Sequence, residues 1–174
     1  MNLVKLQNEI HQQNKDMGWW DEPRTFDVFV CLFHSELSEA MEGDRKNLMD
    51  DHLPHYEMFW VELADFVIRV MDCLGSEGNT EYNCTVLGVE STRTRLLAEQ
   101  HRLVTDAYSR SEDPYYGPRK HYLTTLSSSV VNCLKYAELH NVDLLQIIDE
   151  KRAYNLTRDD HKPENRVKAN GKKY

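Results

Sequence analysis

This sequence lacks the features that mark secreted and membrane-spanning proteins. Its four cysteines are widely scattered and none falls in a CxxC or zinc-like spacing, which predicts a reduced intracellular protein. The first residues, Met1–Lys5, contain no secretory apolar core. No apolar run approaches the roughly 20 residues of a membrane helix. We therefore expect a cytoplasmic protein that makes no membrane contact.

Positive charge is also in short supply. The chain has 21 lysines and arginines against 29 aspartates and glutamates, so its formal net charge is −8. Binding to a nucleic-acid polymer needs clustered Lys and Arg side chains that neutralise phosphates, and this composition argues against that class of partner. An acidic excess suits a protein that gathers carboxylates around metal ions.

The alternating pattern of a β-strand is missing over any useful length, whereas helical periodicity recurs along the chain. The 174 residues are enough for one domain with a substantial core. The apolar spacing predicts helices at about residues 2–15, 24–44, 55–74, 89–111, 119–140 and 144–157. We therefore predict an all-α fold, a helical bundle.

Two pairs of acids lie within the two most apolar of these helices. Glu36 and Glu39 form the first pair, and Glu62 and Asp65 form the second. Each pair is spaced i, i+3, so both carboxylates of a pair share one side of a helix. Carboxylates in apolar surroundings need compensation, and a hard divalent cation such as Mg²⁺ or Mn²⁺ supplies it through oxygen ligands.

The two acid pairs must face each other if they are to share an ion. The connection at 44–54 is short enough to join two neighbouring antiparallel helices, which would bring the pairs together. Glu42 is a weaker candidate ligand because it lies nearer the helix end. The alternative interpretation is that both pairs lie on a narrow solvated stripe.

A second group of polar residues lies on the last predicted helix. Lys151, Asn155 and Arg158 are spaced i, i+4, i+7 and therefore project from one side. A point charge, a neutral donor and a bidentate guanidinium together suit phosphate oxygens. The alternative is a solvated basic helix end, which the helix dipole also favours.

Aromatic and histidine side chains near the first acid pair are further candidates. Trp19 and Trp20 precede the second helix and are candidates for stacking on a nucleobase, with Trp20 preferred; core packing is the alternative for the pair. His34 lies close to the acids on the same helix, and we expect it to form a hydrogen bond rather than to bind a metal directly.

The chain resembles a known family in four segments. These are Gly18–Arg24 (GWWDEPR), His34–Ala40 (HSELSEA), Glu62–Asp65 (ELAD) and the late Lys151 with Tyr154–Arg158 (YNLTR). In this order and at this separation they resemble the MazG-like nucleoside triphosphate pyrophosphohydrolases of the all-α NTP pyrophosphatase group. The resemblance covers about residues 1–75 and 140–162.

The resemblance implies hydrolysis of nucleoside triphosphates between the α and β phosphates, for removal of unwanted nucleotides or control of a nucleotide pool. It implies that Glu36, Glu39, Glu62 and Asp65 bind Mg²⁺, with Mn²⁺ as a second choice. It also implies that Lys151, Asn155 and Arg158 contact phosphates, and that the chain forms a homodimer or homotetramer. In this scheme Glu39 is a candidate general base. Lys151 is a candidate catalytic residue because it would stabilise the charge on the departing pyrophosphate.

The resemblance also implies how the chain is organised into domains. Residues 1–160 would form one domain with a four-helix metal-binding core, and the segment from about 76 to 139 would be an inserted helical hairpin that compact relatives lack. Ser35 stands where many relatives carry another Glu. The tail at 161–174 is polar and basic, and we expect it to be mobile.

Three other functions remain as alternatives. A di-iron bundle would need Glu-x-x-His pairs, and the sequence contains none. A non-catalytic helical module would bind a nucleotide or a protein partner without releasing pyrophosphate. Hydrolysis of phosphoribosyl-ATP is a related enzyme activity, which the Gly-Trp-Trp segment and the central insertion make less attractive.

Overall fold

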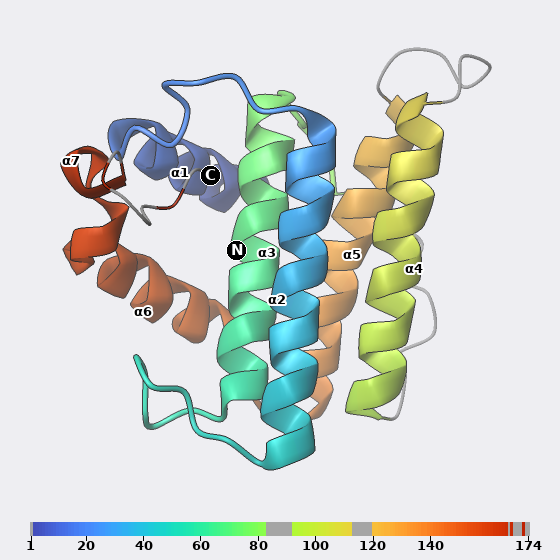
Figure 1. Ribbon diagram of the computed structural model, residues 1–174. Helices are drawn as coiled ribbons and strands as arrows, with labels where there is room; N and C mark the ends of the chain where they lie inside the picture. Colours follow the sequence, from blue (N-terminus) through green and yellow to red (C-terminus); the bar gives the residue numbers. More distant parts are fainter. Residues whose placement is uncertain (1, 83–91, 113–119, 167, 169–171, 173–174) are drawn as a thin grey trace.

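The structure is a computed structural model, and it describes residues 2–82, 92–112, 120–166, 168 and 172. Its helices are α1 (Leu3–Asp16), α2 (Phe26–Lys46), α3 (Met58–Ser76), α4 (Arg93–Glu112), α5 (Lys120–Leu139), α6 (Leu144–Thr157), the short 3-10 helix η2 (Asp159–His161) and α7 (Pro163–Arg166). The described residues form no β-strand. The predicted all-α bundle is therefore confirmed, and each long helix lies within a few residues of its predicted range (Figure 1).

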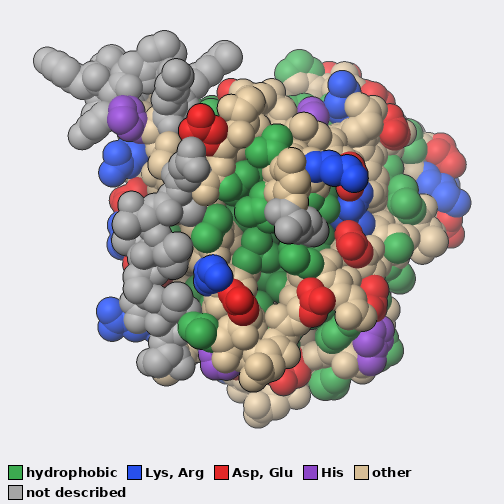
Figure 2. Space-filling view, turned by 180° about the vertical axis from the view of Figure 1, so that it is seen from behind, with side chains coloured by type: hydrophobic (Ala, Val, Ile, Leu, Met, Phe, Trp, Pro, Cys, Tyr) green, Lys and Arg blue, Asp and Glu red, His purple; other side chains and the backbone are tan. Residues whose placement is uncertain are grey.

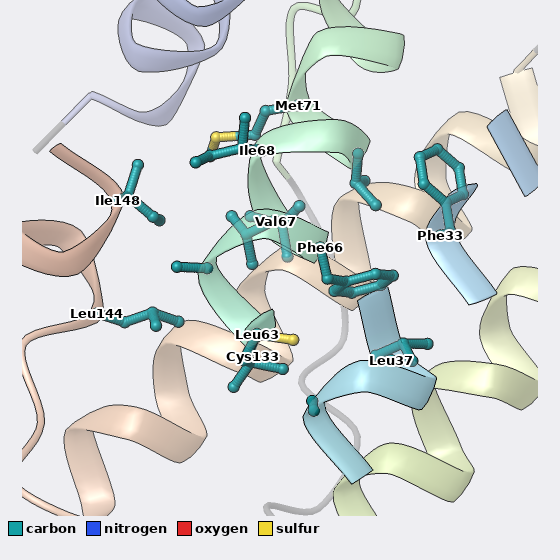
Figure 3. Close-up of a cluster of buried hydrophobic side chains, with 14 of the residues drawn as sticks. Phe33, Leu37, Leu63, Phe66, Val67, Ile68, Met71, Cys133, Leu144 and Ile148 are labelled. Atoms are coloured by element: carbon teal, nitrogen blue, oxygen red, sulfur yellow. The ribbon is translucent and has the colours of Figure 1, made fainter. Parts of the chain in front are cut away.

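Helix α3 is the centre of the bundle because its sequence is apolar on nearly every side. It packs against α1, α2, α5 and α6. Figure 3 shows side chains of α2, α3, α5 and α6 meeting around it, among them Leu37, Phe66, Cys133 and Leu144. Each large apolar side chain buried in this way stabilises the fold by about 1.5–3 kcal/mol.

Helices α2 and α3 form the antiparallel pair that the acid motifs require (Figure 1). Asn47 ends α2 in the left-handed conformation, at φ 52°. In the connection, Asp50 accepts hydrogen bonds from the backbone N–H groups of His52 at 2.9 Å and Leu53 at 2.7 Å. A Cβ atom on Gly43 would lie only 2.8 Å from Cβ of Met58, so the absence of a side chain lets the two helices approach closely here.

The predicted hairpin of the central segment consists of α4 and α5. The two helices lie side by side, with α4 against α2 and α5 against α3 and α6 (Figure 1). Buried side chains of α1 through α6 belong to one hydrophobic cluster. The central segment therefore extends the same core and does not form a second one.

The chain after α6 folds back toward the start of the molecule. Arg166 of α7 donates a hydrogen bond from Nη2 to the Met17 carbonyl at 3.0 Å, and its guanidinium lies 4.1 Å from the ring centre of Trp19. Folded structure thus reaches beyond residue 160, further than the sequence predicts. Among the helices that the structure describes, none has the length and apolar character needed to cross a membrane.

The reverse face of the molecule carries an apolar hollow. Figure 2 shows hydrophobic side chains gathered at the centre of this face. A groove between α1, α5 and α6 is lined by apolar side chains that include Leu3, Val131, Leu134, Val142 and Leu145. This groove shares no lining residue with the pocket beside the acid motifs.

Candidate metal centre and adjoining pocket

Three of the four predicted acids converge between α2 and α3. Glu36 comes from α2, and Glu62 and Asp65 come from consecutive turns of α3. One carboxylate oxygen of each lies within 4.8 Å of the others. Glu36 and Glu62 are buried, and Asp65 is partly buried. The predicted convergence of the two helices is therefore present for these three carboxylates.

Glu39 lies at the margin of this group. It is exposed, and its Oε1 accepts a hydrogen bond from the Ser35 hydroxyl at 2.8 Å. Residues three apart on a helix are offset by about 60° around its axis, so Glu39 points further toward solvent than Glu36. Its charge still contributes to the raised pKa values of Glu36 and Glu62. Glu42, the weaker candidate, pairs with Arg45 and Lys46 instead.

Two basic side chains neutralise part of the acidic group. The Arg69 guanidinium pairs through Nε with Oε1 of Glu36. Lys151 Nζ lies 3.0 Å from Oδ2 of Asp65, and the Lys151 side chain is almost fully buried. Burial alone would lower the pKa of Lys151, but the attraction of Asp65 raises it overall. Lys151 is therefore held in its charged form.

The group contains three carboxylates but only two cationic side chains, so one carboxylate has no cationic partner within it. Burial, followed by the nearby charges of Asp65 and Glu36, raises the pKa of Glu62 to about 9. Glu62 is therefore protonated at neutral pH when no other cation is present. Burial also raises the pKa of Glu36, although the Arg69 charge opposes this.

A pocket of about 90 Å³ adjoins the acidic group. Its apolar wall includes Trp19, Phe29 and Ile68. Its charged wall includes Arg24, Arg69, Arg158, Asp65 and Asp72. Concave sites with an apolar lining and a few convergent polar groups are the common form of small-molecule sites. The pocket therefore joins an acidic end to a region rich in guanidinium groups.

The predicted phosphate-contacting residues divide between the acids and the pocket. Lys151 is bound to Asp65, as described above. Asn155 lines the pocket, and its Oδ1 is buried without a hydrogen-bond partner in the described part of the chain. Arg158 follows the last residue of α6 in an extended conformation, lines the pocket and makes a bidentate pair with Asp160 at 2.9 and 2.7 Å. The sequence predicts that all three residues share one helix face, and this is wrong for Arg158, which lies outside α6.

The two tryptophans have different surroundings. Trp19 lines the pocket and contacts both the Arg166 guanidinium and the His161 ring, whose centre is 5.3 Å away. Trp20, the residue predicted to stack on a base, instead lies against Phe29 with ring centres 5.4 Å apart. Its Nε1 donates to Oδ1 of Asp72 at 3.0 Å. The structure thus favours the core-packing alternative for Trp20 and leaves Trp19 facing the pocket.

His34 forms the predicted hydrogen bond, through a partner on the inserted hairpin. Its Nδ1 lies 2.8 Å from Nδ1 of His101 on α4. Burial lowers the pKa of both histidines, and each also lies close to the other ring. One ring must donate and the other accept, so the neutral pair carries a single proton between these two nitrogen atoms.

The sequence did not mark Arg24, Arg69, Asp72 or His161 as site residues, although all of them line the pocket. Arg69 and Asp72 follow Asp65 by four and seven residues, so helical spacing alone could have identified them as neighbours of the acid motif. His161 had no such signal because it belongs to η2, beyond the last long helix. Burial and the nearby Arg158 charge lower the pKa of His161 to about 4, and its buried Nδ1 has no partner in the described residues.

Comparison with known proteins adds no relative. No protein-family model matches this chain, and no curated protein or solved structure is significantly similar to it.

Proposed function

We propose that this protein hydrolyses nucleoside triphosphates to the nucleoside monophosphate and pyrophosphate, in a reaction that depends on Mg²⁺. The observation that carries the proposal is the convergence of Glu36, Glu62 and Asp65 at the acidic end of a pocket whose wall includes Arg158 and Asn155. The pairing of acidic and guanidinium groups suits a substrate that reaches the protein as a complex of phosphates with a cation.

The donor set fits a hard divalent cation. All three converging ligands are carboxylates, which Mg²⁺ and Mn²⁺ accept and softer ions favour less. The raised pKa of Glu62 agrees with this, because the three carboxylates would together carry more negative charge than Arg69 and Lys151 neutralise. When bound, the ion supplies positive charge for triphosphate oxygens and lowers the pKa of a coordinated water.

We assign Glu39, Lys151 and Arg158 separate roles in one displacement reaction at the α-phosphorus. A water oxygen attacks the α-phosphorus, the bond from that phosphorus to the bridging oxygen breaks, and the electron pair leaves with pyrophosphate. Glu39 takes the proton of the water, since it is solvent-accessible and oriented by the Ser35 hydroxyl. Lys151 and Arg158 stabilise the charge that develops on the departing pyrophosphate.

The test is a comparison of two Glu→Gln variants for Mg²⁺-dependent release of pyrophosphate from a nucleotide panel. Glu62→Gln keeps the size of a converging ligand but removes its charge, so we expect turnover to fall by at least roughly 100-fold, as for other groups that act in the transition state. Glu42→Gln is the matched control, because this partly exposed residue pairs only with Arg45 and Lys46 among the described contacts. Unchanged turnover in Glu62→Gln, or release of orthophosphate instead of pyrophosphate, would refute the assignment.

A non-catalytic nucleotide-binding module is the second candidate. The ion pairs Glu36–Arg69 and Asp65–Lys151 favour it, because they satisfy two of the three acids without a metal ion. Under this alternative the wild-type protein binds nucleotides tightly and yields no pyrophosphate with either Mg²⁺ or Mn²⁺.

A further inference from the structure

The pocket beside the acidic group runs along one side of α3. Asp65, Arg69 and Asp72 all line it and are spaced i, i+4, i+7, so they lie on the same side of the helix. Seven residues of α-helix span about 10 Å. Asp65 therefore marks the end of the pocket that belongs to the acidic group, and Asp72 marks a carboxylate two turns away at the other end.

Asp72 is buried and held in a fixed orientation by two side chains. His11 Nδ1 lies 2.7 Å from Oδ1 of Asp72, and since an ionised carboxylate only accepts hydrogen bonds, His11 donates. Trp20 Nε1 donates to the same Oδ1 at 3.0 Å and more distantly to Oδ2 at 3.3 Å. Both good donors thus bind one oxygen, and Oδ2 retains acceptor capacity.

The surroundings of Asp72 indicate which kind of ligand could donate a hydrogen bond to its carboxylate. Trp19 and Phe29 line the pocket, and the Arg24 guanidinium lies 5.5 and 5.7 Å from their ring centres, so a flat ligand would stack on these rings in place of Arg24. The cavity of about 90 Å³ is smaller than the ~150 Å³ apolar cavity that holds a benzene molecule, so a single ring already requires some movement of the walls and a fused double ring requires much more.

We infer that Asp72 is a specificity-determining residue that accepts a hydrogen bond from the exocyclic amino group of a single-ring base, which makes cytosine nucleotides the preferred ligands. This inference rests on the proposed function, because it places the phosphates at the Asp65 end of the same pocket. Acidic side chains pair with the N4 amino group of cytosine. Uracil presents an acceptor oxygen at that position, and two acceptors facing each other in a buried site disfavour binding.

The direct test is calorimetric titration of the full chain with CMP and with UMP in the presence of Mg²⁺. We expect the wild-type protein to bind CMP roughly tenfold more tightly than UMP. A factor of this size is typical when one hydrogen bond distinguishes two bases. In Asp72→Asn, the amide oxygen stays with the donors His11 and Trp20, so the amide nitrogen takes the place of Oδ2. We expect this variant to bind UMP more tightly than CMP, because the amide can donate to O4 of uracil.

A ligand-side measurement keeps the test independent of the folding of the variant. The CMP analogue that lacks the exocyclic amino group, 2-pyrimidinone ribonucleoside monophosphate, should bind the wild-type protein roughly tenfold more weakly than CMP. Asp51→Asn, in the exposed part of the α2–α3 connection, is the control that should keep the wild-type preference. Equal binding of CMP, UMP and the analogue, or no binding of any of them, would overturn the inference.

The two proposals can fail separately. If CMP is preferred and Asp72→Asn reverses the preference, but no triphosphate yields pyrophosphate, the base assignment stands and the hydrolytic function is wrong. If CTP and UTP both yield pyrophosphate at equal kcat/KM and Asp72→Asn leaves this ratio unchanged, the hydrolytic function stands and the role of Asp72 is wrong.

Discussion

Lys151 Nζ on α6 lies 3.0 Å from Oδ2 of Asp65 on α3, with only 3% of the lysine side chain exposed. This ion pair fixes α6 to the central helix α3 at the position where the acids converge. The charge of Asp65 is thereby compensated from within the chain, and any divalent ion that binds Asp65 has to compete with an ammonium group.

Replacing this lysine should make the fold dependent on divalent ions. Lys151→Met removes the partner of a largely buried carboxylate, and we expect a loss of stability of up to about 3 kcal/mol. Mg²⁺ should then raise the melting temperature of Lys151→Met by more than it raises that of the wild type. Thermal unfolding with and without Mg²⁺ measures both effects. Lys135→Met, which breaks an exposed pair with Glu138, serves as the control and should change little. A Mg²⁺ response equal to that of the wild type would contradict this account.

Arg69 should compete with metal ions for Glu36. In Arg69→Gln the guanidinium no longer pairs with this carboxylate, so the acidic group gains negative charge. We expect Mn²⁺ to bind Arg69→Gln roughly tenfold more tightly than it binds the wild type, a coupling of about 1.4 kcal/mol. Titration calorimetry or electron paramagnetic resonance of Mn²⁺ measures the affinity. Arg102→Gln, which disturbs only exposed pairs on α4, should leave the affinity unchanged. Weaker Mn²⁺ binding in Arg69→Gln would show that Arg69 supports the site.

The protonated state of Glu62 predicts how stability depends on pH. Its pKa in the folded protein is about 9, well above the ordinary glutamate value of 4.5, so the folded protein binds one more proton than the unfolded chain between these limits. Stability from this group is therefore complete below about pH 4.5 and is lost as the pH rises toward about 9.

Urea unfolding in EDTA at several pH values measures this dependence. Glu62→Gln is neutral at every pH and should be more stable than the wild type at pH values near 9, with a flatter profile. Saturating Mg²⁺ should flatten the wild-type profile as well, because a bound cation favours the ionised carboxylate. Profiles of the same slope in EDTA for the two proteins would place the titration on another group.

Two glycines with similar backbone angles offer a test of the contact between the tail and the Trp19 segment. Gly18 has φ +74° and Gly78 has φ +68°, so alanine is strained at both, by about 1 kcal/mol. A Cβ atom on Gly18 would also lie 2.7 Å from Oδ2 of Asp21, 2.9 Å from Nη2 of Arg166 and 3.3 Å from Cγ of Pro163, whereas at Gly78 it would meet open space. We expect Gly18→Ala to lose more stability than Gly78→Ala in chemical unfolding. The difference should shrink when Arg166→Ala is added, and a difference that persists unchanged would mean that the tail is not packed there in solution.

The helices could be predicted from sequence because their signals are local. The apolar stripe of α2, the all-round apolar sequence of α3 and the Asp143 cap of α6 each depend on residues within a few turns of one another. The approach of Glu36 to Glu62 and Asp65 was also predictable, since a short connection forces consecutive helices to lie side by side. The magnesium ion, the substrate and the oligomeric state remain predictions.

The partners of those acids were not predictable in the same way. Glu36 and Glu39 form one i, i+3 pair on α2, yet only Glu36 is buried. The packing of the apolar stripe of α2 sets the rotation of the helix about its axis, and this rotation decides which acid faces the core. Trp19 and Trp20 are neighbours in sequence, but only Trp19 lines the pocket. The ion pair of Arg69 and the hydrogen bonds of Asp72 likewise join residues that are distant in the chain.

Alone, the sequence determined the helices, the all-α class and the sides of α2 and α3 on which the acids lie, because backbone hydrogen bonding and side-chain periodicity act over a few residues. The tertiary structure decided which acids converge, that Arg69 and Lys151 neutralise two of them, and that Asp72 lies at the far end of the pocket. These depend on the rotation and approach of whole helices, which the packing of the entire core sets at once.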